Sequence, residues 1–218
     1  MKYIVTCGGV YRKWKTPRQL LLFRGEPIVA RTVRLLRENG VGDIAISSNL
    51  PGFDGFGVPV LVHENGYDAT AYNDSRGDWC DVFYPLDAPA CYVFGDVIFS
   101  RDAVRRIVKT QTDDIAFFGS RPPFAREYPK HWIEPFAFKV QDWRHLRRAV
   151  EDFKRCDREG RFNRRPIAWE MWNIISRGPD GDVNTIDYDS YVAINDWTCD
   201  VDKPEEIPLM EMMAAREE

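Results

Sequence analysis

The stretch of sequence that decides the fold is short, apolar and closed by a carboxylate: Cys91-Tyr92-Val93-Phe94-Gly95-Asp96. Its four apolar residues predict a buried strand, and the Gly-Asp pair predicts that the chain turns immediately afterwards. In open α/β sheets, ligands bind beyond the carboxyl ends of the parallel strands, and an Asp oxygen is a ligand that Mg²⁺ prefers. The stretch therefore makes Asp96 a candidate metal ligand, with a plain Gly-Asp turn as the alternative.

Short apolar runs alternate with helical patterns on both sides of this stretch, which is typical of an α/β fold with a mostly parallel sheet. We expect further strands at residues 3–6, 43–47, 58–62, 114–118, 131–140 and 191–194. Helices are expected to begin at Pro27, after Ser100, after Asp142, at Pro166 and at Pro204. No internal repeat, low-complexity tract or long linker interrupts this pattern, so it indicates a single compact domain over residues 1–218.

The composition narrows the class of protein. The 218 residues carry 30 Lys and Arg against 34 Asp and Glu, a net charge of -4, and 44% of them are hydrophobic, as in a folded globule. This mild acidity argues against a protein that coats nucleic acid. No apolar run approaches the roughly 20 residues of a membrane helix. The five cysteines are scattered without a C-x-x-C pair. We therefore expect a cytoplasmic protein with reduced thiols and with neither a nucleic-acid nor a membrane partner.

The loop after the first strand combines glycines with cations. Paired glycines let the backbone approach a ligand closely and turn its N–H groups toward an anion. The residues concerned are Cys7, Gly8, Gly9, Arg12, Lys13, Lys15 and Arg18. Together they favour a triphosphate cradle, although the loop has neither the Walker A nor the dinucleotide-binding motif. A Gly-Gly turn beside a solvated basic loop is the alternative.

A third pattern, close to the C-terminus, is acidic. Asp200 and Asp202 alternate in an extended segment, so their side chains point the same way. Pro204 then begins a helix that has Glu205 and Glu206 in its first turn, where negative charge is favourable. The pattern fits either a ligand-binding pair of carboxylates or an acidic turn in which Asp202 caps the helix.

Taken in order, the three motifs resemble the GT-A-like nucleotidyltransferases, which include sugar-phosphate, phosphocholine and molybdenum-cofactor nucleotidyltransferases. That family has a Gly-rich loop, an Arg, Pro-Lys-x-Leu, Gly-x-Pro-hydrophobic, a strand ending in Gly-Asp, and a late Asp-hydrophobic-Asp-x-Pro-Glu segment. The counterparts here are Gly8-Gly9, Arg12, Pro17-Arg18-Gln19-Leu20, Gly25-Glu26-Pro27-Ile28, Phe94-Gly95-Asp96 and Asp200-Val201-Asp202-Lys203-Pro204-Glu205. The chain departs from the family in having a shorter glycine loop and in placing Arg18 where a Lys is expected.

The resemblance implies a three-layer α/β/α sandwich with a Rossmann-like, mostly parallel sheet. Residues 1–118 would form a nucleotide-binding half, and residues 119–218 an acceptor-binding half with a C-terminal helix. The implied activity joins an NTP to a phosphorylated small-molecule acceptor, such as a sugar phosphate or a phosphocholine-like compound, and releases pyrophosphate. The resemblance leaves the base, the acceptor and the oligomeric state open, with a homodimer among the options.

The resemblance also implies roles for individual residues. Asp96, Asp202 and Asp200 would hold Mg²⁺, while Arg18 and Arg12 would be the catalytic cations. The implied nucleotide contacts are Cys7, Gly8, Gly9, Lys13, Lys15, Asn73 and Ser75. Glu134 and Trp132 would contact the acceptor, because an aromatic group beside a carboxylate suits a quaternary amine. Ordinary packing is the alternative for both residues.

Two other functions remain open at this level. One is a GT-A glycosyltransferase that uses a nucleotide sugar, but such enzymes carry Asp-x-Asp at the strand end, and here residue 94 is Phe. The other is a catalytically inactive relative that still binds a nucleotide. The short glycine loop and the substitution at Arg18 favour this second alternative.

Overall fold

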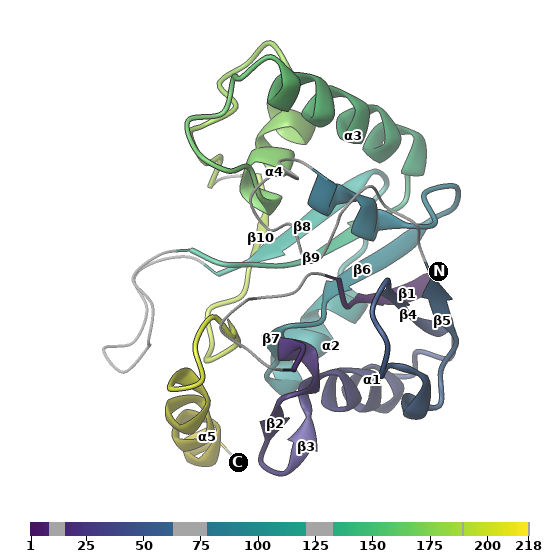
Figure 1. Cartoon of the computed structure of the whole chain (residues 1–218), viewed down its shortest axis with the longest axis vertical. Coiled ribbons are helices and arrows are strands. Elements are labelled where there is room, and N and C mark those ends of the chain that lie inside the picture. The colour runs from purple at the N-terminus through teal and green to yellow at the C-terminus, as the bar shows by residue number, and fades with distance from the viewer. Residues whose placement is uncertain (9–15, 63–77, 121–132, 189, 218) are drawn as a thin grey trace.

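The computed structural model describes residues 1–8, 16–62, 78–120, 133–188 and 190–217. Its centre is a seven-stranded sheet with the strand order β10-β8-β9-β6-β1-β4-β5 (Figure 1). These strands are β1 (Lys2–Thr6), β4 (Ile44–Ser48), β5 (Val60–Val62), β6 (Ala90–Phe94), β8 (Ile115–Gly119), β9 (Pro135–Val140) and β10 (Val192–Ala193). Strand β9 runs antiparallel to β6 and β8, and the other neighbouring strands are parallel. The prediction of a mostly parallel α/β sheet is confirmed.

Helices cover both faces of the sheet. They are α1 (Ile28–Glu38), α2 (Arg101–Lys109), α3 (Trp143–Arg158), α4 (Ala168–Arg177) and α5 (Glu206–Glu217). Helices α1 and α2 lie on one face and α3 and α4 on the other (Figure 1). Helix α5 lies beside the hairpin of β2 (Leu22–Phe23) and β3 (Glu26–Pro27) (Figure 1), and its Met210 and Met213 share a third core cluster with Phe23. Within the described residues, no helix combines the length and the apolarity that a bilayer crossing requires.

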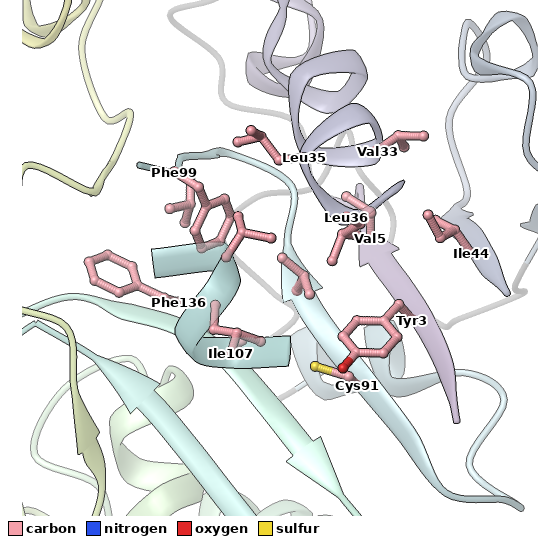
Figure 2. Packing of buried hydrophobic residues seen from close by; sticks show 14 of the residues in the cluster. Tyr3, Val5, Val33, Leu35, Leu36, Ile44, Cys91, Phe99, Ile107 and Phe136 are labelled. Atoms are coloured by element: carbon pink, nitrogen blue, oxygen red, sulfur yellow. The ribbon is translucent and has the colours of Figure 1, made fainter. Parts of the chain in front are cut away.

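The alternation of side chains along β1 explains these layers. Successive side chains of a strand point to opposite faces of the sheet. Tyr3 and Val5 belong to the core cluster that contains Leu36 of α1 and Ile107 of α2 (Figure 2). Ile4, between them, belongs to the second cluster, with the residues of α3 and α4. Burying a large apolar side chain contributes about 1.5–3 kcal/mol, so both faces of this strand stabilise the sandwich.

Two short ribbons lie outside the main sheet. Strand β2 (Leu22–Phe23) pairs with β3 (Glu26–Pro27), and β7 (Val97–Ile98) pairs antiparallel with β11 (Cys199–Asp200). The sequence patterns did not predict the second ribbon, because a strand of two residues is too short to show the alternation by which strands are recognised.

The predicted helix boundaries are confirmed in part. Ser100 caps α2, because its Oγ accepts a hydrogen bond from Ala103 N at 2.9 Å, and Asp142 caps α3 in the same way. The prediction that Pro27 is the first residue of α1 was wrong, because Pro27 pairs with Leu22 in the hairpin and the helix begins one residue later. Likewise α4 begins at Ala168 instead of Pro166.

Candidate functional site

Asp96 lies in the turn between β6 and β7, and this turn is tightly packed against β1. Gly95 N donates a hydrogen bond to Thr6 O at 3.0 Å. A Cβ atom on Gly95 would lie 2.6 Å from Cys7 Sγ and 2.6 Å from Thr6 O. Only glycine fits this approach, which explains why the Gly-Asp pair follows the strand and why Asp96 emerges beside β1.

Arg18 joins three parts of the chain at this point. It begins the short 3₁₀ helix Arg18–Leu20, and its Nη2 lies 2.7 Å from Asp96 Oδ2. Its Nη1 donates to Asp202 Oδ1 at 3.0 Å and to Val201 O at 2.7 Å. The planar fork of a guanidinium can serve several oxygens at once, which a lysine ammonium does less well. Arg18 therefore binds the two candidate metal-ligating segments together.

The β7–β11 ribbon brings the acidic segment to Asp96. Asp200 pairs with Val97, and Val201 N donates to Asp96 O at 2.9 Å. The next turn is fixed by Glu206, whose Oε2 accepts hydrogen bonds from Asp202 N at 2.8 Å and from Lys203 N at 3.0 Å. Glu206 thus makes the backbone hydrogen bonds at this helix start, and the Asp202 carboxylate is turned toward Arg18.

A cavity of about 240 Å³ opens beside these groups. Arg18, Asp96 and Asp200 form its charged side. The remaining lining residues are Thr6, Gly8, Gln19, Trp79, Val82, Phe94, Pro135, Ile167 and Ala168. Most of these are apolar. The cavity therefore combines an apolar lining with a few charged groups, as expected of a small-molecule site.

The charges at the cavity shift one another's ionisation. Burial raises the pKa of Asp96 above its ordinary value; Arg18 opposes this effect, and the neighbouring Asp200 and Asp202 add to it. Burial also opposes the charge of Arg18, but the carboxylates of Asp96, Asp200 and Asp202 outweigh it and raise the pKa of the guanidinium. Burial and then the charge of Asp96 raise the pKa of the Cys7 thiol. The structure thus concentrates negative charge around one cation, as functional sites often do.

Five of the residues proposed from sequence converge here. Gly8, Arg18, Asp96 and Asp200 line the cavity, and Asp202 joins them through Arg18. Two others lie beneath the site. Cys7 is buried against Gly95, and Glu134 is 1% exposed and accepts a hydrogen bond from Asp200 N. Neither is among the residues that line the cavity. The other proposed contacts fall outside the described residues, namely Gly9, Arg12, Lys13, Lys15, Asn73, Ser75 and Trp132.

Several cavity residues had no signal in the sequence. Trp79 and Val82 come from the 3₁₀ helix Asp78–Phe83, and Ile167 and Ala168 from the start of α4. Their positions in the sequence form no motif, so only the fold brings them together. Gln19 could have been singled out, because it lies inside the Pro-x-x-Leu motif beside Arg18.

Comparison with known proteins identifies the fold. No family model matches the chain, and no curated protein matches its sequence. Solved structures do match. The 2-C-methyl-D-erythritol 4-phosphate cytidylyltransferase of Thermus thermophilus aligns over 98% of both chains, with a TM-score of 0.61 and 13% identity. The chain has the nucleotidyltransferase fold.

Two further structures with this fold are similar over nearly their whole length. A CMP:2-keto-3-deoxy-manno-octonic acid synthetase complexed with CTP aligns over 100% of this chain and 99% of its own, with a TM-score of 0.57 and 14% identity. The CTP:phosphocholine cytidylyltransferase of Streptococcus pneumoniae aligns over 97% of each chain, with a TM-score of 0.52 and 14% identity. The resemblance inferred from the motifs is thus confirmed at the level of the fold.

Proposed function

We propose that this protein is a Mg²⁺-dependent nucleotidyltransferase that joins an NTP to a phosphorylated small-molecule acceptor and releases pyrophosphate. The observation that supports this most is the convergence of Arg18, Asp96 and Asp202 beside a cavity. The convergence lies at the carboxyl end of β6, where open α/β sheets bind ligands. The solved structures of the same fold include enzymes whose names specify cytidylyl transfer.

The donor set fits a magnesium ion. Mg²⁺ takes oxygen ligands and usually binds through one or two carboxylates together with substrate phosphates. Asp96 and Asp200 both line the cavity, and the carboxylates of Asp96 and Asp202 both form ion pairs with Arg18. These three residues would hold the ion, which when bound would neutralise charge on the phosphates and polarise the P–O bonds.

The reaction we propose is an in-line displacement. An oxygen of the acceptor phosphate forms a bond to the α-phosphorus, while the bond from that phosphorus to the oxygen bridging to the β-phosphate breaks. Pyrophosphate leaves with the electron pair of that bond. Because such a transfer needs little covalent chemistry from the protein, alignment and charge stabilisation supply most of the rate.

The residues of this chain would divide these tasks. Gly8 brings the backbone close to the triphosphate, and Arg18 neutralises the charge that develops near the α-phosphorus. We propose that Arg12, Lys13 and Lys15, which follow Gly8 in the sequence, neutralise the β and γ phosphates. Asn73 and Ser75 remain our candidates for the base and sugar, and Trp132 for the acceptor.

A protein that binds a nucleotide without turnover is the second candidate. Arg18 already pairs with both Asp96 and Asp202, so a cation sits between the carboxylates that an enzyme would use for metal. A glycosyltransferase is less well supported, because Phe94 lines the cavity where Asp-x-Asp would place a carboxylate.

One assay tests these functions. The protein is incubated with Mg²⁺, each of the four NTPs and a panel of phosphorylated acceptors, and pyrophosphate is measured. We expect release with one NTP–acceptor pair. Asp96→Ala should abolish it, while the control Asp102→Ala, at an exposed position on α2, should retain it.

The remaining outcomes would point to the other functions. Thermal stabilisation by an NTP without pyrophosphate release from any pair would support the nucleotide-binding relative. Transfer of sugar from a UDP-sugar would support the glycosyltransferase. Turnover that survives in Asp96→Ala would overturn the assignment of Asp96 as a metal ligand.

A further inference from the structure

Glu134 is a buried glutamate whose side chain reaches the backbone of the acidic segment. It immediately precedes β9 and is 1% exposed. Its Oε2 accepts a hydrogen bond from Asp200 N at 3.0 Å. The adjacent residue, Pro135, lines the cavity, but Glu134 does not. The side chain of Glu134 is therefore directed toward the segment that carries Asp200 and is not part of the cavity lining.

The backbone of Glu134 is itself held in place. Ser120 N donates to Glu134 O at 2.9 Å, and Glu134 N donates to Ser120 Oγ at 2.8 Å. The strands approach so closely here that a Cβ on Gly119 would lie 2.9 Å from Glu134 O. Because Ser120 is also fully buried, Glu134 is a fixed point from which the acidic segment can be aligned.

The charge of Glu134 acts in the same direction as its hydrogen bond. A carboxylate oxygen of Glu134, Cys199 Sγ and a carboxylate oxygen of Asp200 lie within 4.8 Å of one another. Two carboxylates at this separation repel each other, most strongly away from water. Asp200 has a cation on its cavity side, because Arg18 lines the same cavity. Repulsion from Glu134 and attraction to Arg18 therefore both direct the Asp200 carboxylate into the cavity.

We propose that Glu134 is a positioning residue that aligns Asp200 for a divalent cation. This inference rests on the proposed function, because it assigns Asp200 to the metal. Because Glu134 does not line the cavity, we assign it an effect on Asp200 through its hydrogen bond and its charge instead of a place among the ligands. Residues that orient metal ligands in this way typically change metal affinity by about 10- to 100-fold when they are mutated.

Two variants separate the hydrogen bond from the burial. Glu134→Gln keeps an oxygen that can accept from Asp200 N, whereas Glu134→Leu removes the acceptor at similar volume. Asn173→Leu is the control: the Asn173 side chain is fully buried in α4, its Oδ1 accepts from Asp187 N at 3.2 Å, and its Nδ2 donates to Val183 O at 3.1 Å. Asn173 is not among the cavity-lining residues. The control therefore reports what the loss of buried hydrogen bonds between a side chain and the backbone does away from the cavity.

Two measurements are made on the full-length protein. Electron paramagnetic resonance of free Mn²⁺ gives the affinity for Mn²⁺ alone, and hydrogen exchange gives the protection of the Asp200 amide. We expect Glu134→Leu to lose about 10- to 100-fold in Mn²⁺ affinity and to exchange the Asp200 amide faster. Glu134→Gln keeps the hydrogen bond and removes the repulsion, so it should protect the Asp200 amide as the wild type does and lose less Mn²⁺ affinity than Glu134→Leu. Asn173→Leu should leave both unchanged.

Three results would overturn the proposal. Glu134→Leu could fold and bind Mn²⁺ with wild-type affinity, or it could leave the exchange of the Asp200 amide unchanged. Alternatively, Glu134→Gln could lose as much Mn²⁺ affinity as Glu134→Leu. The last result would mean that the hydrogen bond to Asp200 N adds nothing to the effect of the charge of Glu134. If the wild-type chain binds no Mn²⁺, the proposed function fails instead, and the exchange of the Asp200 amide alone decides whether Glu134 holds that backbone.

Discussion

Arg18 Nη2 lies 2.7 Å from Asp96 Oδ2, so the first residue of the 3₁₀ helix Arg18–Leu20 neutralises the carboxylate that follows β6. The same guanidinium reaches Asp202 at 3.0 Å. Arg18 is thus a resident counter-ion of the carboxylates that we propose for Mg²⁺. A cation at this position must compete with a metal ion for the same oxygens.

Replacing Arg18 should therefore have opposite effects on metal binding and on turnover. In Arg18→Met we expect the affinity for Mn²⁺ alone to rise about tenfold, a change of about 1.4 kcal/mol. Turnover should fall by about 10²- to 10³-fold, as it does when other groups that stabilise developing charge are removed. Titration with Mn²⁺ and the pyrophosphate assay measure the two effects. Arg18→Lys keeps the charge without the fork and should lie between the two proteins. Mn²⁺ affinity that is unchanged in Arg18→Met would contradict the competition.

Neutralising Asp96 should make the protein more stable and inactive. Burial, together with the charges of Asp200 and Asp202, outweighs the attraction of Arg18 and raises the pKa of Asp96. The ionised carboxylate therefore lowers the free energy of unfolding at neutral pH. Asp96→Asn keeps the shape and removes the charge, so its melting temperature should exceed that of the wild type, a common trade-off at active sites.

Thermal denaturation at pH 7 checks this expectation. The control is Asp102→Asn on α2, where the side chain is 75% exposed and the change should have little effect. A melting temperature that falls in Asp96→Asn would show that the ion pair with Arg18 outweighs the burial of the carboxylate.

Gly95 should tolerate no side chain. The Cβ of Gly95→Ala would meet Cys7 Sγ and the backbone oxygen of Thr6, each at 2.6 Å. Since a backbone atom cannot move aside easily, we expect a loss of about 1–3 kcal/mol or more. Gly42→Ala is the matched control, because a Cβ there has nothing within 4 Å. Urea denaturation of both variants checks this, and equal stabilities would contradict the packing argument.

An ion-pair network on α1 should make stability depend on pH in acid. Arg34 binds Glu26 at 2.7 Å and Glu38 at 2.7 Å, and Arg101 binds Glu38 from α2. The hydrogen bond from Arg34 lowers the pKa of both glutamates from its ordinary value, although burial partly opposes it. A carboxylate with a lowered pKa stabilises the fold above its unfolded pKa, and this contribution is lost as the pH falls through the folded pKa.

Arg34→Met should therefore flatten the fall in unfolding free energy below about pH 4.5, near the ordinary pKa of Glu. The effect should be small, because pairs this exposed contribute only about 0–1 kcal/mol and are screened by salt. Denaturation curves across the acid range measure it. Arg105→Met, which removes an exposed pair with Asp102 on α2 alone, serves as the comparison. If the unfolding free energies of wild type and Arg34→Met fall identically with pH in acid, the network does not contribute to the pH dependence of stability.

The sequence predicted those features that depend on short-range patterns. The apolar run at Cys91–Phe94 predicted β6, and Ser100 and Asp142 predicted helix starts through their capping chemistry. The three motifs correctly grouped Arg18 with Asp96 and Asp202, because the resemblance supplied a relationship that spacing alone does not. These predictions depended on local propensity or on a motif, and both can be read from one chain.

The features that sequence did not predict depend on tertiary contacts. The β7–β11 ribbon consists of two-residue strands that no periodicity reveals. The orientation of Glu134, which the resemblance assigns to the acceptor, depends on contacts with Ser120 and with the backbone of Asp200 that no motif indicates. The apolar lining of the cavity, which includes Trp79 and Ile167, likewise forms only when α4 packs against the sheet.

The β7–β11 ribbon also determines at which stage of protein synthesis the proposed site can form. A ribosome makes the protein from its N-terminus, so β1, β6 and Asp96 emerge long before Cys199 and Asp200. Until those residues pair with β7, the nascent chain has Asp96 and Arg18 but lacks the remaining carboxylates. A chain made only as far as β6 can thus form several strands of the sheet, but the cation site that we propose is complete only after residues 199–202 have been made and have paired with β7.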